Sequence, residues 1–172
     1  VETEVSRICC PELDSLVHLK TTQANRASQP LLAGPLTLLR ESGTVGRTEI
    51  GFVAPSEVFT IGWGSDDGLR VHRRLEEKRD RATITGKQTI TKNIELALSN
   101  LDDEATSFTV MERIPVSEID QVRITIDQKE SSRGSASNDQ GIIEWPMTLE
   151  GHDTKKLKLT YKIVANGSVD GL

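Results

Sequence analysis

The stretch that decides the fold is Leu157-Lys158-Leu159-Thr160-Tyr161-Lys162-Ile163, in which every second side chain is large and apolar. A β-strand places successive side chains on opposite faces of its sheet, so this alternation buries one face and leaves the other in water. A helix would not gather these residues on one side. The stretch therefore predicts a half-buried β-strand.

The same alternation recurs along the chain. Three further stretches show it clearly: Ile94, Leu96 and Leu98; Val122, Ile124 and Ile126; and Ile143, Trp145, Met147 and Leu149. Turn signals such as Ala33-Gly34-Pro35 and Asp66-Asp67-Gly68 separate shorter runs of the same kind. Short alternating strands between turn signals are typical of sandwiches and barrels. We expect an all-β fold, an antiparallel β-sandwich with little or no helix.

Residues 75–82, Leu-Glu-Glu-Lys-Arg-Asp-Arg-Ala, have local helical propensity. They include one large apolar residue and therefore offer no stripe that could dock on a core. Strand patterns lie on both sides, at Leu69-Val71 and at Ile94-Leu96-Leu98. We expect a long charged β-hairpin arm whose outer half is exposed, with a two-residue turn at Gly86-Lys87 where glycine takes a positive φ.

We expect a single β-rich domain over residues 1–172, or two β lobes joined near residues 69–98. Residues 131–141, Ser-Ser-Arg-Gly-Ser-Ala-Ser-Asn-Asp-Gln-Gly, offer almost nothing to bury, which predicts a flexible loop without essential contacts. The chain begins at Val1 and not at Met, and nothing near it looks like a signal peptide. We expect a fragment of a longer protein, and a leader before Val1 stays open.

Composition narrows the classes of protein. Hydrophobic residues make up 35% of the chain and charged residues 27%, and no apolar run is long enough for a membrane-spanning helix. The formal net charge of −5 disfavours binding to nucleic acid. Cys9 and Cys10 are adjacent, so they cannot cross-link distant parts of the chain, and we expect ordinary strand cysteines.

Two motifs together carry a family resemblance: Ile114-Pro115-Val116-Ser117 and the later Gly141-Ile142-Ile143-Glu144-Trp145. With them, residues 15–165 resemble the C-terminal β domain of the mucoidy inhibitor A family, known mainly as a domain of unknown function. The chain departs from that family at Ser56, where a Pro-Gly-Glu turn would be usual. The resemblance implies an antiparallel β architecture and a bacterial origin, and it supplies no established catalytic residues. We expect a bacterial cytoplasm, or the periplasm or envelope if a leader precedes Val1.

Few residues suggest chemistry. His18, His72 and His152 lie far apart without metal-ligand spacing, and no nucleotide-binding or nucleophile motif is present, so we expect no metal and no cofactor. Asp66 and Asp67 suggest paired carboxylates for acid–base work or cation binding. The favoured alternative is a polar turn in which an aspartate accepts hydrogen bonds from backbone amides before Gly68.

Two further candidate sites concern binding. Trp63 could stack on a sugar ring, although a core or seam position is the favoured reading. Arg73, Arg74, Lys78 and Arg79 could contact an acidic partner, although interruption by Glu76, Glu77 and Asp80 favours a solvated arm.

These observations favour a non-catalytic binding or interaction module that presents loops and the charged arm to a protein partner or an envelope component. Two alternatives stay open. One is a hydrolase of envelope polysaccharide, which needs facing carboxylates in a cleft. The other is a structural domain that pairs strands or forms oligomers.

Overall fold

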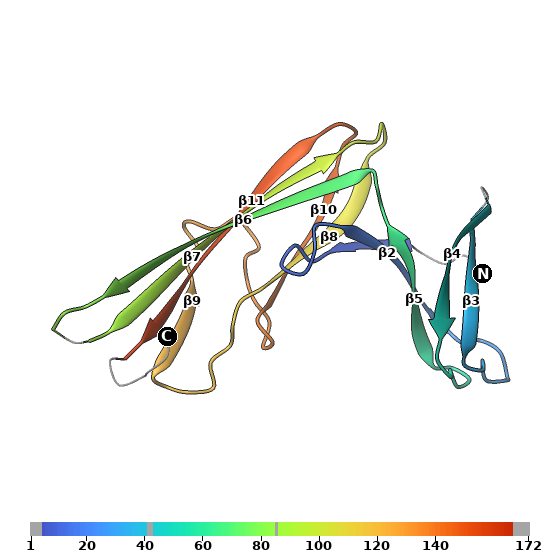
Figure 1. The fold of residues 1–172 in the computed structure, drawn as a ribbon, viewed down its shortest axis with the longest axis horizontal. Helices are drawn as coiled ribbons and strands as arrows, with labels where there is room; N and C mark the ends of the chain where they lie inside the picture. The colour runs from blue at the N-terminus through green and yellow to red at the C-terminus, as the bar shows by residue number, and fades with distance from the viewer. Residues whose placement is uncertain (1–4, 41–42, 85, 167–172) are drawn as a thin grey trace.

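The computed structural model describes residues 5–40, 43–84 and 86–166 (Figure 1). Within these ranges the chain forms β-strands and no helix. The strands are β1 (Val5–Cys9), β2 (Val17–Ala24), β3 (Gly34–Arg40), β4 (Gly43–Ile50), β5 (Val58–Ser65), β6 (Leu69–Arg81), β7 (Gln88–Asn100), β8 (Thr106–Arg113), β9 (Val122–Ile126), β10 (Ile142–Leu149) and β11 (Thr154–Ala165).

Two sheets form the sandwich. One has the strand order β10-β8-β1-β2-β5 and the other β6-β7-β11-β9. Neighbouring strands run antiparallel except β1 and β8, which pair in parallel through Ile8 with Thr109 and Cys9 with Val110. The core cluster draws side chains from both sheets, so the sheets pack face to face. The expected all-β antiparallel sandwich is confirmed.

The alternating stretches form the inner faces. Ile94, Leu96 and Leu98 of β7 pack in the core with Leu157 and Leu159 of β11. The cross-strand pairs Leu96 with Leu157 and Ile94 with Leu159 place these side chains on one face. Burial of that face is the main stabilisation of the sandwich, because apolar area removed from water dominates folding.

The charged arm is a hairpin, as expected. β6 and β7 pair without interruption from Leu69 opposite Asn100 to Arg81 opposite Gln88. Ladder pairing along this length outweighs the helical propensity of residues 75–82. The expected two-residue turn is wrong, because the strands end at Arg81 and Gln88 and a longer connection closes on a hydrogen bond from Ala82 N to Lys87 O of 2.9 Å. Gly86 does take the positive φ, 67°.

Residues 131–141 make specific contacts. The amide of Thr160 donates to the hydroxyl of Ser131 over 2.9 Å, and the amide of Ser132 donates to the carbonyl of Lys158 over 2.8 Å. Ser135 is buried, and its hydroxyl donates to the carbonyl of Ser132. Residues 131–141 are therefore held to their surroundings by hydrogen bonds of small polar side chains and backbone, and not by buried apolar side chains. Whether these contacts are essential to stability, and whether the segment is mobile, stay predictions.

Strands β3 and β4 form a separate two-stranded sheet, seen beside β5 at the right of Figure 1. Leu38 and Val53 are buried there, and an isolated bridge joins Leu31 to Val53. Other large apolar side chains of this region stay exposed: Leu32, Leu39, Val45, Phe52 and Val58. The division into two lobes near residues 69–98 stays a prediction.

Candidate functional site

The turn after β5 holds two of the predicted site residues. Asp66 accepts a hydrogen bond from the Gly68 amide at 3.1 Å and pairs with Arg7 through Nε and Oδ2 at 2.6 Å. Asp67 accepts from the Ser65 hydroxyl at 3.4 Å. The polar-turn reading of Asp66 is confirmed, since its carboxylate caps the amide of Gly68.

Trp63 lies on β5 and is partly buried. Its indole Nε1 donates to the hydroxyl of Thr21 on the neighbouring β2 at 2.9 Å. Thr21 itself is buried. This hydrogen bond holds the indole against the neighbouring strand of its own sheet, which agrees with a structural position for Trp63.

Arg73 points into the sandwich and away from the other predicted cations. Its Nε lies 2.8 Å from Oε1 of Glu112 and its Nη2 lies 3.2 Å from Oε2, which makes a two-pronged ion pair. The Glu112 side chain is fully buried on β8, while Arg73 keeps 20% exposure on β6. The pair links the two sheets across the core. Sequence reasoning missed Glu112, although the alternation of Phe108 and Val110 continues to it.

The remaining cations lie on the exposed half of the arm. Arg74 pairs with Glu76 at 2.7 Å, Lys78 with Asp80 at 3.6 Å and Arg79 with Glu77 at 2.6 Å. Each cation therefore has an acidic neighbour on the same strand. The arm presents mixed charge, and the predicted site residues lie in three separate places.

Burial around the Arg73–Glu112 pair perturbs nearby groups. Burial raises the pKa of Glu112, and Arg73 partly offsets this rise. Burial, with the charge of Glu12 next in size, also raises the pKa of Tyr161. Burial together with Asp14 raises the pKa of the Cys9 thiol to about 12. The Cys9 thiol therefore stays protonated at neutral pH and is a poor nucleophile.

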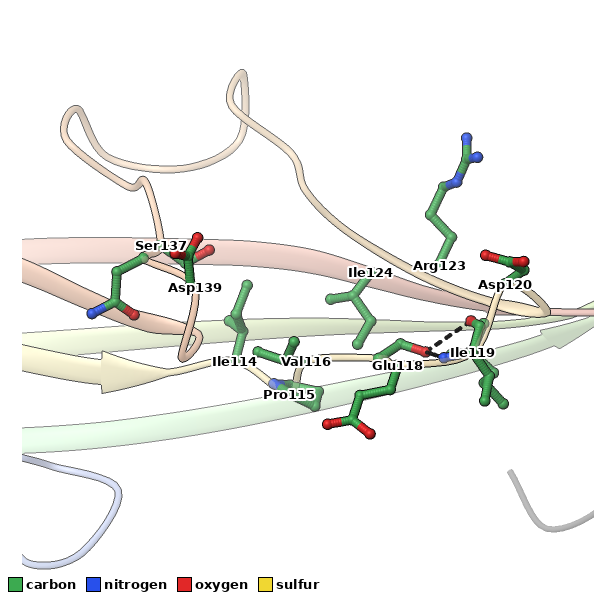
Figure 2. Close-up of a pocket in the computed structure, with 13 residues that line it drawn as sticks. Ile114, Pro115, Val116, Glu118, Ile119, Asp120, Arg123, Ile124, Ser137 and Asp139 are labelled. Atoms are coloured by element: carbon green, nitrogen blue, oxygen red, sulfur yellow. Dashed lines mark hydrogen bonds between the residues drawn. The ribbon is translucent and has the colours of Figure 1, made fainter.

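A groove of about 530 Å³ lies at the connection between β8 and β9 (Figure 2). One wall is the connection itself with the start of β9, and the other is the turn before β10. Ser137 and Asp139 lie at the end beside Ile114, and Asp120 and Arg123 lie at the opposite end (Figure 2). The lining residues are Ile114, Pro115, Val116, Ser117, Glu118, Ile119, Asp120, Val122, Arg123, Ile124, Ser137, Asn138 and Asp139.

Local chemistry keeps the connection out of both sheets. Pro115 has no amide hydrogen to give to a ladder and restricts the residue before it. The Ser117 hydroxyl donates to the carbonyl of Ile119 at 3.1 Å and lies 3.3 Å from its amide (Figure 2). The amide of Val122 then donates back to the carbonyl of Ile119 at 3.2 Å, and β9 begins. The sequence thus specifies an ordered turn.

The two motifs that carry the family resemblance are joined by a backbone hydrogen bond at Ile114, which lines the groove. The amide of Ile114 donates to the carbonyl of Gly141 at 2.9 Å. Gly141 has a φ of 78°, and a Cβ there would meet the carbonyl oxygen of Ile114. Only glycine fits, which explains why Gly141 opens the second motif. The sequence analysis quoted both motifs for the family resemblance, but it did not predict that they lie together and form part of a candidate site.

The groove combines exposed apolar and acidic side chains. Val116 is 55% exposed and Ile119 is 52% exposed. Three carboxylates, from Glu118, Asp120 and Asp139, line it against the single cation of Arg123. A net acidic, mainly polar groove with exposed apolar side chains at Val116 and Ile119 suits an extended segment that carries basic and apolar side chains.

In the ranges 5–40, 43–84 and 86–166, no three His, Cys, Asp or Glu side chains converge as metal ligands would. In the same ranges, no helix has the length and apolar character needed to cross a bilayer.

The chain is thus an all-β sandwich domain that carries a groove at the connection between β8 and β9. Residues 9–167 match the family model described as Domain of unknown function (DUF4139), and the chain belongs to that family. Protein F37C4.5 of Caenorhabditis elegans is 22% identical over 135 residues, which cover 76% of this chain and 24% of that protein. The chain thus spans about a quarter of the length of this curated relative. No solved structure matches the chain.

Proposed function

We propose that the domain is a non-catalytic interaction module that binds an extended segment of a protein partner in the groove beside Ile114–Ser117. The observation that carries the proposal is the exposure of Val116 and Ile119, 55% and 52%, within a hollow of about 530 Å³. Apolar side chains grouped in a concave surface are a usual mark of an interaction site.

The backbone of the connection supports the same proposal. Among the described residues, Val116 and Glu118 make no backbone hydrogen bond. An extended partner can take up such groups by pairing its own main chain with them, while its side chains enter the groove. The acidic lining favours basic side chains on that partner.

The charged arm is a weaker candidate for the contact. Arg74, Lys78 and Arg79 already pair with acids of their own strand, so a partner would have to replace those pairs. Surface pairs of this kind contribute little stability, and mixed charge gives no single attractive field.

Charge reversal tests the proposal. The variant Glu118→Lys/Asp120→Lys/Asp139→Lys should lose most of the proteins that the wild-type domain retains from a lysate of the source cells. The matched variant Arg74→Glu/Lys78→Glu/Arg79→Glu should retain them. Circular dichroism checks that both variants fold. Equal retention by the groove variant and the wild type would reject the groove, and loss in the arm variant alone would assign binding to the arm.

A second candidate function is self-association through the β3–β4 sheet. Within the described residues these two strands pair only with each other, and Leu39 of β3 and Phe52, just after β4, are 63% and 60% exposed. Unpaired strand edges with apolar side chains favour edge pairing. Sedimentation velocity over a range of concentrations tests this. A dimer that Leu39→Lys/Phe52→Lys abolishes would support it, and a monomer at every concentration would reject it.

A hydrolase of envelope polysaccharide remains the catalytic alternative. It requires facing carboxylates in a cleft. Asp66 is held by Arg7 and by the Gly68 amide, and neither Asp66 nor Asp67 lines the groove. Three other carboxylates do line it, those of Glu118, Asp120 and Asp139, so the catalytic alternative stays open. For the interaction module, we also propose a link to the mucoidy inhibitor A family and a partner in the bacterial envelope. Both rest on the sequence resemblance alone.

A further inference from the structure

Two sets of four strands share one arrangement: β2, β3, β4 and β5, and β7, β8, β10 and β11. In each set the first and last strands pair with each other, and so do the middle two. A buried asparagine stands at the end of the first strand, Asn25 directly after β2 and Asn100 as the last residue of β7. The side-chain amide of each asparagine donates to two consecutive carbonyls of a later turn, at residues 53–54 and 149–150.

The later turn and the last strand also correspond. Each turn has one residue other than glycine with a positive φ, Ser56 at 66° and His152 at 59°. Two residues later the last strand begins, and its first residue pairs with the residue before the asparagine: Val58 with Ala24, and Thr154 with Ser99. The two sets therefore match in register along β5 and β11, which equates Gly62 with Lys158.

The two sets have hollows at corresponding places, but only one of the hollows is covered. β10 and β11 flank a hollow of about 420 Å³, and residues 132–134 add a third wall to it. β4 and β5 flank a hollow of about 240 Å³, whose described lining comes only from these strands and the turn between them. The cover belongs to the connection between β8 and β10, residues 114–141, whereas only residues 41–42 separate β3 from β4.

The cover also satisfies the outer edge of β11. The amide of Lys158 donates to the hydroxyl of Ser132 at 2.9 Å, and the carbonyl of Lys158 accepts from the amide of Ser132 at 2.8 Å. The equivalent edge of β5 holds Gly62 and, two residues earlier on the same side, Thr60. Among the described residues β5 pairs only with β2, and no hydrogen bond outside that pairing reaches the backbone of Thr60 or Gly62. This edge therefore has room for another strand.

We propose that the outer edge of β5 binds an extended segment of a partner protein, which pairs with the backbone of Thr60 and Gly62 and covers the β4–β5 hollow with basic side chains. This site is separate from the groove beside Ile114–Ser117. Strand addition of this kind draws its affinity from main-chain hydrogen bonds. A Cβ on Gly62 would meet nothing within 4 Å, so a second backbone can approach closely.

The charge of the hollow specifies the partner. Glu49 and Glu57 line it, and no lysine or arginine is among its described lining residues. Basic side chains on the added segment complement these carboxylates. Two copies of the same acidic edge would repel each other, which disfavours a second copy of this chain as the occupant.

Peptide selection on the full chain tests the proposal. The probe is a phage-displayed library of random peptides long enough for a strand of about six residues. We expect the selected peptides to be enriched in lysine and arginine. Thr60→Pro removes one outward amide from an edge strand and should weaken their binding about tenfold or more. Thr60→Val loses the same hydroxyl but keeps the amide, so this matched control should change affinity less than about twofold.

Further measurements separate this edge from other sites. Glu49→Lys should weaken binding, and Glu118→Lys/Asp120→Lys/Asp139→Lys in the other groove should not. In the ¹⁵N-labelled wild type, the selected peptides should shift the Gly62 amide signal saturably and leave that of Lys158 in place, a readout that does not depend on any variant. Circular dichroism checks the fold of each variant.

Four results would overturn the proposal. The first is equal affinity of the peptides for folded Thr60→Pro and Thr60→Val, and the second is no saturable shift of the Gly62 signal. The third is selection of acidic peptides. The fourth is self-association of the wild type that Thr60→Pro abolishes, which would assign the edge to a second copy.

Discussion

Arg73 of β6 and Glu112 of β8 join the two sheets of the sandwich through paired contacts of 2.8 and 3.2 Å. Both partners sit at positions that the strand alternation reserves for apolar side chains. A buried ion pair is weak evidence for net stability, because desolvation of both charges offsets their attraction. Removal of only one partner is strongly destabilising, because the other charge then stays buried without a counter-charge.

The first prediction concerns this pair. Arg73→Met should lower the free energy of unfolding by about 3–5 kcal/mol, because Glu112 stays buried without its partner. The double variant Arg73→Met/Glu112→Leu should recover most of that loss, since both charges are gone. Urea denaturation measures both values. Arg74→Met, at an exposed position of the same strand, is the control and should change stability by less than about 0.5 kcal/mol. Additive losses in the double variant would contradict the coupling.

The second prediction concerns pH. Burial raises the pKa of Glu112 in the folded state above its unfolded value of 4.5. The folded state then holds this proton more tightly, so the contribution is fully present below the unfolded pKa and is lost as pH rises through the folded pKa. Wild-type stability relative to Glu112→Gln should therefore fall as the pH rises above the unfolded value of 4.5.

The difference in unfolding free energy between the wild type and Glu112→Gln reports on Glu112 alone, because every other titrating group is present in both proteins. The pKa of Asp14 is lowered by its hydrogen bond with His18, which gives the opposite pH dependence, and it acts equally in both proteins. Urea denaturation at several pH values provides the measurement. A relative stability of the wild type that rises with pH would mean that Arg73 outweighs burial at Glu112.

The third prediction separates Arg73 from the other cations of the arm. Arg74, Lys78 and Arg79 are 67%, 75% and 65% exposed, so reversal of each to Glu should cost less than about 1 kcal/mol. Arg73→Glu should prevent folding, because it places a second carboxylate beside buried Glu112. Thermal melting measures each variant. A stable Arg73→Glu protein would contradict the buried position of this pair.

The fourth prediction concerns residues 131–141. Replacement by a Gly/Ser linker should lower the free energy of unfolding by about 3 kcal/mol, because several partly buried hydrogen bonds of about 1 kcal/mol each are lost. Ser135→Ala should account for about 1 kcal/mol of this loss. Ala136→Gly, at an exposed position of the same segment, is the control. An unchanged melting temperature of the linker variant would restore the view of a loop without essential contacts.

The sequence was sufficient for most strands and for the hairpin arm, because period-two alternation reports directly which face is buried. It did not single out β4, whose side chains are mostly exposed. It was not sufficient for the arm's turn, since the strand ends depend on where the ladder with β7 stops. It also missed the contacts of Ser131, Ser132 and Ser135, because serine looks the same in a loose loop and in a hydrogen-bonded one.

The site was harder to predict than the fold. Arg73 looks like its neighbours in the sequence, and only the packing of β8 against β6 shows that Glu112 faces it. The groove depends on Ile114 and Gly141, which are far apart in the chain and meet through one backbone hydrogen bond. Contacts of this kind follow from tertiary structure and leave no local pattern.

Site-specific photo-crosslinking tests the central claim, the partner-binding groove, most directly. A benzoylphenylalanine at Val116 in the groove is compared with one at Ile84, which is 98% exposed at the arm, and one at Leu13, which is 81% exposed. We predict a specific cross-linked partner at Val116, lost on Glu118→Lys/Asp120→Lys/Asp139→Lys, with none at Leu13. No specific cross-link at Val116, or the same partner from Ile84 alone, would contradict the account.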